Sequence, residues 1–143
     1  MEITLKQLNE SFNSLSKLAN YDRFGKDQVR LKYRLSRTWK SAKSEIKEMQ
    51  LSIQDLMNSY GIEAGQPITQ IPGEIWKEFE ARQKDLLEGI KVELWGDPIE
   101  LKEILHLECL TPADLADLDW LFIDDFGDPE GLAEDNKAQG AQI

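Results

Sequence analysis

The amino-acid sequence predicts an α+β fold that is mostly α: an antiparallel helical hairpin with one long helix, further short helices and a small antiparallel β-sheet. Apolar residues recur at steps of three and four between Leu35 and Tyr60, which is the repeat of one helix face. The repeat changes to two between Ile90 and Leu94, which is typical of a strand. Because only the short turn 20–25 precedes the long helix, that helix should fold back on the helical stretch before it.

The first helix is predicted to begin directly after Thr4 and to end near position 20. Thr4 and Gln7 fit a capping box, and Ile3 with Leu8 fits the hydrophobic staple that accompanies it. An alternative interpretation makes residues 2–5 a short strand before the helix. The sequence leaves these two interpretations open.

The second helix is predicted over residues 26–60, about 50 Å at 1.5 Å per residue. Gly61 follows it, as expected just past a helix C-terminus. Since this helix is longer than a small domain is wide, other segments must pack along it, and its far end would be exposed unless the third helix or another chain covers it. Its apolar stripe consists of Leu35, Trp39, Ala42, Ile46, Met49, Ile53, Leu56 and Tyr60.

Residues 61–73 contain three Gly and two Pro without a regular period, so we expect a loop. Pro72 suits the first turn of a third helix over residues 74–88. The strand at 90–94 then reaches a Gly-Asp-Pro turn, and residues 99–101 are predicted to return as the second strand of a hairpin. The predicted sheet therefore covers residues 90–102, with 2–5 as a candidate further strand.

A short fourth helix is predicted to begin at Thr111, with Pro112 at its first position and Asp114 in its first turn. From Gly127 the sequence is rich in Gly, Ala, Asp, Glu and Gln and has almost no apolar residues. We therefore expect residues 1–126 to form a single domain and residues 127–143 to be a disordered acidic tail.

The net charge of −10 conceals an asymmetry between the two parts of the chain. Residues 1–50 carry 11 Lys/Arg and 6 Asp/Glu, a net +5, whereas residues 51–143 carry 6 and 21, a net −15. The long basic helix can therefore lie against the acidic remainder or against an external charged partner. The sequence does not decide between these alternatives.

The composition is typical of a protein of a reducing cytoplasm. The single cysteine, Cys109, excludes an internal disulfide and a zinc cage made of cysteines. No apolar run approaches the roughly 20 residues that span a bilayer, and the first residues lack the basic start and apolar core of a secretory signal. We expect a cytoplasmic protein without membrane contact and without a cofactor.

The chain contains, in this order, Ile3-Thr4-Leu5 followed by Leu8, Leu15, Lys17 and Leu18, then Tyr33-Arg34-Leu35, Tyr60-Gly61, Val92-Glu93-Leu94, Pro98-Ile99, Leu110 to Leu115, and Leu118 to Leu121. In this order the segments resemble an uncharacterised family of small phage and prophage proteins. The resemblance covers nearly the whole chain to about Asp125, and its most specific part is the stretch from Thr111 to Leu121. It implies an origin in a phage or prophage and action inside a bacterial cell, but no activity and no catalytic residues.

A partner-binding surface is predicted from two tryptophans and an acidic cluster. Trp95 lies on the polar face of its strand and Trp120 lies just off the apolar row of the fourth helix, and aromatic residues concentrate where interfaces derive their energy. The predicted partner-binding residues are Trp95, Trp120, Asp114, Asp117, Asp119, Asp124 and Asp125. Self-association through the long helix is a further expected use of its stripe.

A basic row on the long helix supports an alternative function. The row consists of Arg30, Arg34, Arg37, Lys40 and Lys47, on the side away from the apolar stripe. Such a row can follow the phosphates of a nucleic acid, although surface helices commonly look like this and the whole-chain charge opposes approach to a polyanion. Nucleic acid is therefore the alternative ligand and not the one that we expect.

Neither a metal site nor a catalytic site is predicted. The acidic residues from Asp124 to Glu130 break the register of a calcium loop. His106 and Cys109 lack a recognisable orienting group and oxyanion site. We therefore expect a phage or prophage accessory protein that acts by binding another protein, as a virion assembly factor or a modulator of a host machine, and not an enzyme.

Overall fold

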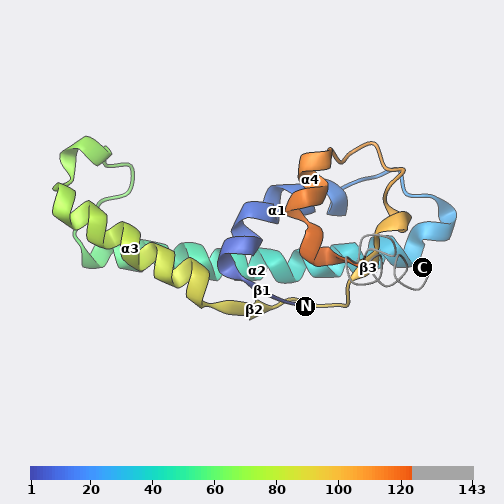
Figure 1. The fold of residues 1–143 in the computed structure, drawn as a ribbon, viewed down its shortest axis with the longest axis horizontal. Helices are drawn as coiled ribbons and strands as arrows, with labels where there is room; N and C mark the ends of the chain where they lie inside the picture. Colours follow the sequence, from blue (N-terminus) through green and yellow to red (C-terminus); the bar gives the residue numbers. More distant parts are fainter. Residues whose placement is uncertain (124–143) are drawn as a thin grey trace, which may run out of the picture.

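The computed structural model describes residues 1–123, and it confirms the mostly helical α+β fold. The long helix α2 (Val29–Ser59), preceded by the 3-10 turn Lys26–Gln28, runs along the longest axis, and the other elements pack along it (Figure 1). At 31 residues α2 is about 46 Å long. Gly61 adopts a φ of 70° just beyond its end, the left-handed conformation that glycine enters without a steric penalty.

Both interpretations of the N-terminus are present in the structure. β1 (Glu2–Thr4) leads directly into α1 (Leu5–Ala19), and the side chains and backbones of Thr4 and Gln7 form the predicted capping box. α1 packs against the first half of α2 and runs in the opposite direction, which is the predicted helical hairpin (Figure 1). Thr4 is both the last residue of β1 and the N-cap of α1, so the strand and the capped helix can follow each other directly.

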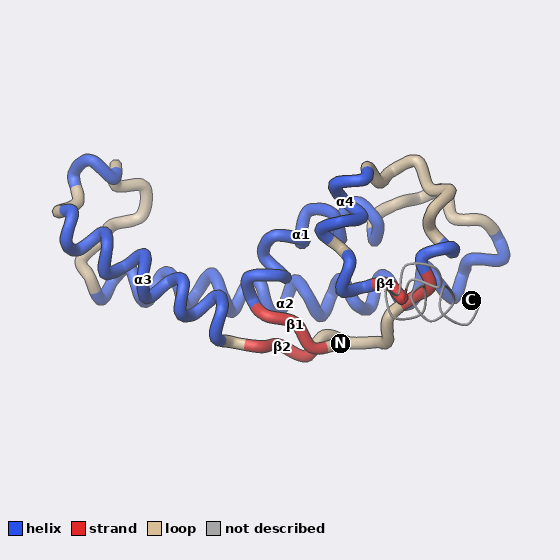
Figure 2. The backbone as a smooth tube through the Cα atoms, in the orientation of Figure 1, coloured by secondary structure: helices blue, strands red, loops and turns tan. Residues whose placement is uncertain are grey.

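The predicted strand hairpin over residues 90–102 is wrong. β2 (Lys91–Glu93) pairs antiparallel with β1, with Ile3 opposite Val92, whereas β3 (Ile99–Glu100) pairs in parallel with β4 (Phe122–Ile123). The two small strand pairs are separate (Figure 2). The chain leaves β2 through a turn that is hydrogen-bonded to side chains of α2, so residues 99–100 are carried away from β2.

α3 (Gly73–Gly89) packs on the far half of α2. This is one of the two ways in which we expected the far end of the long helix to be covered. Phe79 of α3 is buried there with Ile62 and Ile71 from the connecting loop, which also contains the 3-10 turn Ile68–Gln70. Pro72 precedes α3 instead of lying within its first turn, because its carbonyl accepts the Trp76 N–H. The residues of α2 that pack on this cluster are Ile53, Leu56, Met57 and Tyr60.

The main core lies around the first half of α2. α4 (Pro112–Asp117), the 3-10 turns Leu101–Glu103 and Asp119–Leu121, α1 and the strand pairs enclose it. Its completely or almost completely buried large side chains are Leu8, Leu15, Leu18, Leu35, Leu94, Ile104, Leu118 and Leu121. Within residues 1–123, none of the helices combines the length and apolar character needed to cross a membrane. The predicted disordered tail, 127–143, lies outside the described residues.

Candidate functional site

Three large side chains form an exposed stack on the first half of α2. The guanidinium carbon of Arg37 lies 5.1 Å from the centroid of the Trp95 ring and 5.9 Å from that of the Tyr33 ring. The Tyr33 and Trp95 rings meet edge to face with their centroids 6.2 Å apart, and Arg37 Nη1 donates to Tyr33 Oη at 3.3 Å. Tyr33 is 56% exposed and Trp95 38% exposed. We call Tyr33, Arg37 and Trp95 the aromatic patch.

The loop that carries Trp95 is held to α2 by hydrogen bonds. Thr38 Oγ1 donates to the Trp95 carbonyl at 3.0 Å, and the Trp95 N–H donates to Ser41 Oγ at 3.1 Å. Arg34 Nη2 donates to the Asp97 carbonyl at 3.1 Å, one residue beyond Gly96, whose φ of 98° makes the turn. Because both its N–H and its carbonyl are hydrogen-bonded to α2, the Trp95 backbone is held in place before any partner arrives.

The patch borders an open hollow on a strongly basic surface. Arg37, Lys40, Ser41 and Trp95 line a depression of about 440 Å³. Between residues 29 and 43 the helix carries six Lys/Arg and no Asp/Glu. Among residues 1–123, no carboxylate forms an ion pair with any member of the basic row. Within the described part of the chain, the charge of this row is therefore not neutralised.

The structure brings together residues that the sequence assigned to two different functions. Trp95 was predicted to bind a protein partner and Arg37 to contact nucleic acid, yet their side chains are stacked on each other. Arg30, Lys40 and Lys47 are exposed, whereas Arg34 is partly buried by its bonds to the loop. Sequence reasoning missed Tyr33 as a member of the site, although its position on the same helix, four residues before Arg37, was a usable signal.

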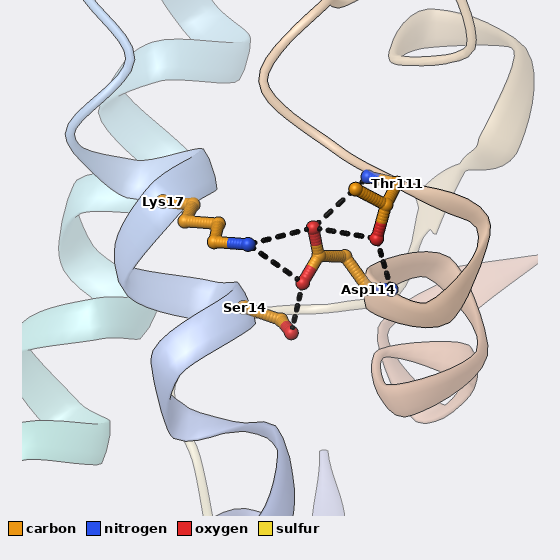
Figure 3. Close-up of polar contacts among 4 residues, drawn as sticks. All are labelled: Ser14, Lys17, Thr111 and Asp114. Carbon is orange, nitrogen blue, oxygen red and sulfur yellow. Dashed lines mark hydrogen bonds and ion pairs between the residues drawn. The ribbon is translucent and has the colours of Figure 1, made fainter.

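Asp114 does not belong to an exposed acidic surface, as its assignment to the partner-binding residues had assumed. Its carboxylate is buried between α4 and α1, where it accepts hydrogen bonds from Ser14 Oγ at 2.7 Å and from Lys17 Nζ at 3.0 Å (Figure 3). It also accepts from the backbone N–H and the hydroxyl of Thr111, at 2.9 and 3.1 Å. Asp114 therefore clamps the start of α4 to α1.

These contacts set the protonation state of Asp114. The Thr111 N–H makes the largest contribution, followed by the Ser14 hydroxyl, and together with the hydrogen bond from Lys17 they hold the pKa of this carboxyl well below its ordinary value, against the opposing effect of burial. Asp114 is thus ionised throughout the neutral and mildly acidic range. Its role is structural, since every contact of the carboxylate is made within the fold.

The remaining predicted partner-binding residues separate from one another. Trp120 is half-buried, and its Nε1 donates at 3.0 Å to Oγ of Ser11, which is fully buried. Asp117 and Asp119 are exposed. Asp124 and Asp125 lie outside the described residues. Of the five predicted residues that the structure describes, only Trp95 belongs to the exposed patch.

His106 and Cys109 are not arranged as a nucleophile and its base. His106 is exposed, and its Nε2 lies 3.5 Å from Gln28 Nε2, whereas Cys109 is half-buried beside the main core. Burial raises the pKa of the Cys109 thiol, and the nearby Asp114 carboxylate raises it further, so the thiol is protonated at neutral pH. Within residues 1–123, no three His, Cys, Asp or Glu side chains are grouped so that they could hold a metal ion.

A second depression lies between α1 and α3, but its lining does not indicate a ligand. It has a volume of about 470 Å³, and its rim alternates in sign, with Lys6, Lys77 and Lys84 near Glu10, Glu80 and Glu88. Such a mixed lining favours neither an anionic nor a cationic ligand. Comparison of the chain with protein-family models, with curated proteins and with solved structures finds no match.

Proposed function

We propose that this chain is a non-enzymatic accessory protein of a phage or prophage that binds another protein through the aromatic patch and the basic row around it. The observation that carries the proposal is the exposed stack of Tyr33, Arg37 and Trp95. Tyrosine, arginine and tryptophan are the residue types that contribute most to binding energy at protein interfaces. Here all three occur in one patch whose backbone is held in place by α2.

The chemistry of the patch indicates an acidic partner surface. Arg30, Arg37 and Lys40 are exposed without a carboxylate partner among residues 1–123, so a partner that supplies Asp or Glu side chains would neutralise them. Complementary charge would also speed encounter between the two proteins. The apolar surface of Trp95 and Tyr33 would then supply the part of the binding energy that does not depend on salt.

Binding of nucleic acid to the same row remains the second candidate function, because aromatic residues beside cations are also typical of single-strand binding. Base stacking, however, needs a free ring face, and the Arg37 guanidinium already lies over the Trp95 ring. The net charge of −10 also opposes a polyanion. The covered ring favours a protein ligand, whereas the net charge opposes any acidic ligand and does not separate the two functions.

The assignment to a phage or prophage, and with it the cytoplasm of a bacterial host, depends on the resemblance of the sequence described above. The proposed role is assembly of virion parts or modulation of a host machine. Self-association through the long helix receives less support than the sequence suggested, because α1 and α3 pack against α2 and its apolar stripe belongs to the two buried clusters.

The experiment that tests this function is affinity capture from infected or prophage-bearing cells, read by mass spectrometry. We expect a specific protein partner that is lost with Trp95→Ala and with Arg37→Glu. Lys84→Glu on α3 is the matched control, since it reverses an exposed charge outside the patch and should retain the partner. A partner set that is identical for all three variants would overturn the proposal.

A gel shift on DNA and RNA at low salt separates the two candidate functions. Nucleic-acid binding that weakens steeply with salt and disappears with Arg30→Glu, Arg34→Glu and Arg37→Glu would favour the second function and overturn the first. Because Arg34 also holds the Trp95 loop, its variant requires a check that the circular dichroism spectrum is unchanged.

A further inference from the structure

The described part of the chain ends beside the basic half of α2. Ile123, the last described residue, is paired in parallel with Glu100, and Phe122 is paired with Ile99. The carbonyl of Pro98, directly before β3, accepts a hydrogen bond from Arg34 of the basic row at 3.3 Å. The chain therefore continues beyond Ile123 from a point close to the row.

The sequence that follows has the opposite charge. Residues 124–143 contain six Asp/Glu and one Lys, a net −5, and the first two of these residues, Asp124 and Asp125, are both acidic. The twenty residues can extend to roughly 66 Å at about 3.3 Å per residue. The row from Arg30 to Lys47 spans only about 26 Å of helix, so the segment is long enough to reach all of it.

We propose that residues 124–143 bind to the basic row of the same chain and act as an internal substitute for an acidic partner. The row lacks a carboxylate partner among residues 1–123, and an oppositely charged segment begins next to it. Attachment through β4 gives this segment a high effective concentration at the row, which favours it over a free ligand of equal charge. The blocking of a binding site by this segment rests on the proposed function. The intramolecular contact between the segment and the row is independent of that function.

The contact can be measured in the full-length chain without any partner. A spin label on Ala133→Cys, in a Cys109→Ser background, should broaden the amide resonances of residues 30–40 at an ionic strength of about 0.01 M, where charge interactions extend about 30 Å. At about 1 M salt, where they extend about 3 Å, the lost intensity should return. Residues 62–71, at the opposite end of the molecule, are the internal reference and should keep their intensity (Figure 1).

Two charge variants of the labelled chain test whether attraction causes the contact. Asp124→Asn, Asp125→Asn, Asp128→Asn and Glu130→Gln together should abolish the broadening, and so should Arg37→Glu combined with Lys40→Glu. Lys77→Glu with Lys84→Glu, two reversals on α3, is the matched control and should leave it unchanged. Equal broadening over the whole chain, or broadening of residues 30–40 that survives neutralisation and high salt, would overturn the proposal.

The variant with four neutralised carboxylates also tests the intramolecular contact separately from the proposed function. If the segment competes with a partner, the chain with four neutralised carboxylates should bind the captured partner more tightly than the wild type. The spin-label measurement contains no partner, so it can fail while Trp95→Ala still abolishes capture. Conversely, the contact can be present in a chain whose patch binds no partner, and the capture experiment alone would then reject the proposed function.

Discussion

The two halves of α2 are stabilised in different ways. Around α2 up to Met49, 17 buried apolar residues form the main core, whereas the rest of α2 and α3 pack around a cluster of only three, Ile62, Ile71 and Phe79. Hydrogen bonds between residues far apart in sequence also stabilise the first half, such as Ser14 to Asp114 and Trp120 to Ser11. We call α2 up to Met49 with its covering elements the body, and the rest of α2 with α3 the arm.

The difference between the body and the arm explains where the candidate site is located. The aromatic patch lies on the body, and the Trp95 loop is hydrogen-bonded to the most heavily covered part of α2. The arm has the smaller buried cluster, and Leu86 and Leu87 near the end of α3 connect it to the main core. We therefore expect the arm to open locally more easily than the body. A site that presents a tryptophan in a fixed position requires the kind of support that only the body provides.

The largest effect is expected from a charge buried in the body. Ile46→Asp places an unpaired carboxylate at an 8% exposed position of the main core, at a cost of several kcal/mol, enough to unfold most of the molecule. Circular dichroism should show loss of helix and of the thermal transition. A fully helical variant with an unchanged melting temperature would contradict the placement of Ile46.

The same truncation in the two regions should have unequal effects. Leu18→Ala removes a completely buried side chain from the body and should destabilise it by about 3 kcal/mol, whereas Leu56→Ala removes a half-buried one from the arm and should cost about 1 kcal/mol. Urea unfolding measures both variants. Equal losses would mean that the arm is as tightly packed as the body.

The clamp between α1 and α4 should make the stability of the body depend on pH. Because the pKa of Asp114 is lower in the folded than in the unfolded chain, its contribution is fully present above about pH 4 and is lost as the pH falls toward the folded value. Asp114→Asn should cost about 2 kcal/mol at neutral pH and remove this acid-dependent part. Unfolding midpoints from pH 7 to pH 2 in both proteins check this, and identical slopes would contradict it.

The smallest expected effect is the difference in stability loss when the indole N–H of Trp120 or of Trp39 is removed. Trp120 Nε1 donates to Ser11, whereas the buried Trp39 Nε1 has no hydrogen-bond partner among residues 1–123. Trp120→Phe should therefore cost about 1 kcal/mol more than Trp39→Phe in thermal unfolding, since it leaves the buried Ser11 hydroxyl without its donor. An equal or larger loss of stability for Trp39→Phe would contradict the hydrogen bond from Trp120 to Ser11.

Local features of the fold could be predicted from the sequence because they depend on neighbouring residues. The capping boxes at Thr4 and Thr111 involve partners three residues away, and the spacing of the α2 stripe reflects the geometry of a single helix. The strand pairing could not be predicted in this way. Residues 90–102 satisfied the pattern of a hairpin, but β1 is the better partner for β2, since Ile3 and Val92 can then both be buried in the main core.

In the candidate site too, single residues could be identified from the sequence, but the contacts between distant residues could not. Trp95 and Arg37 were both identified from the sequence, but as parts of separate functions, because 58 positions separate them and no local pattern relates them. Asp114 was placed in the first turn of the fourth helix, yet its burial depends on Ser14 and Lys17, about 100 residues earlier. Its assignment to an exposed acidic surface failed for that reason.

The sequence by itself determined which segments form the four α-helices, and that one of them is long, basic at its start and apolar along one side. Those properties follow from contacts between residues three and four apart. Only the tertiary structure decided which strands pair, which tryptophan is exposed, and that Arg37 lies on Trp95. These depend on how segments distant in sequence fill the space around α2, which no local repeat encodes.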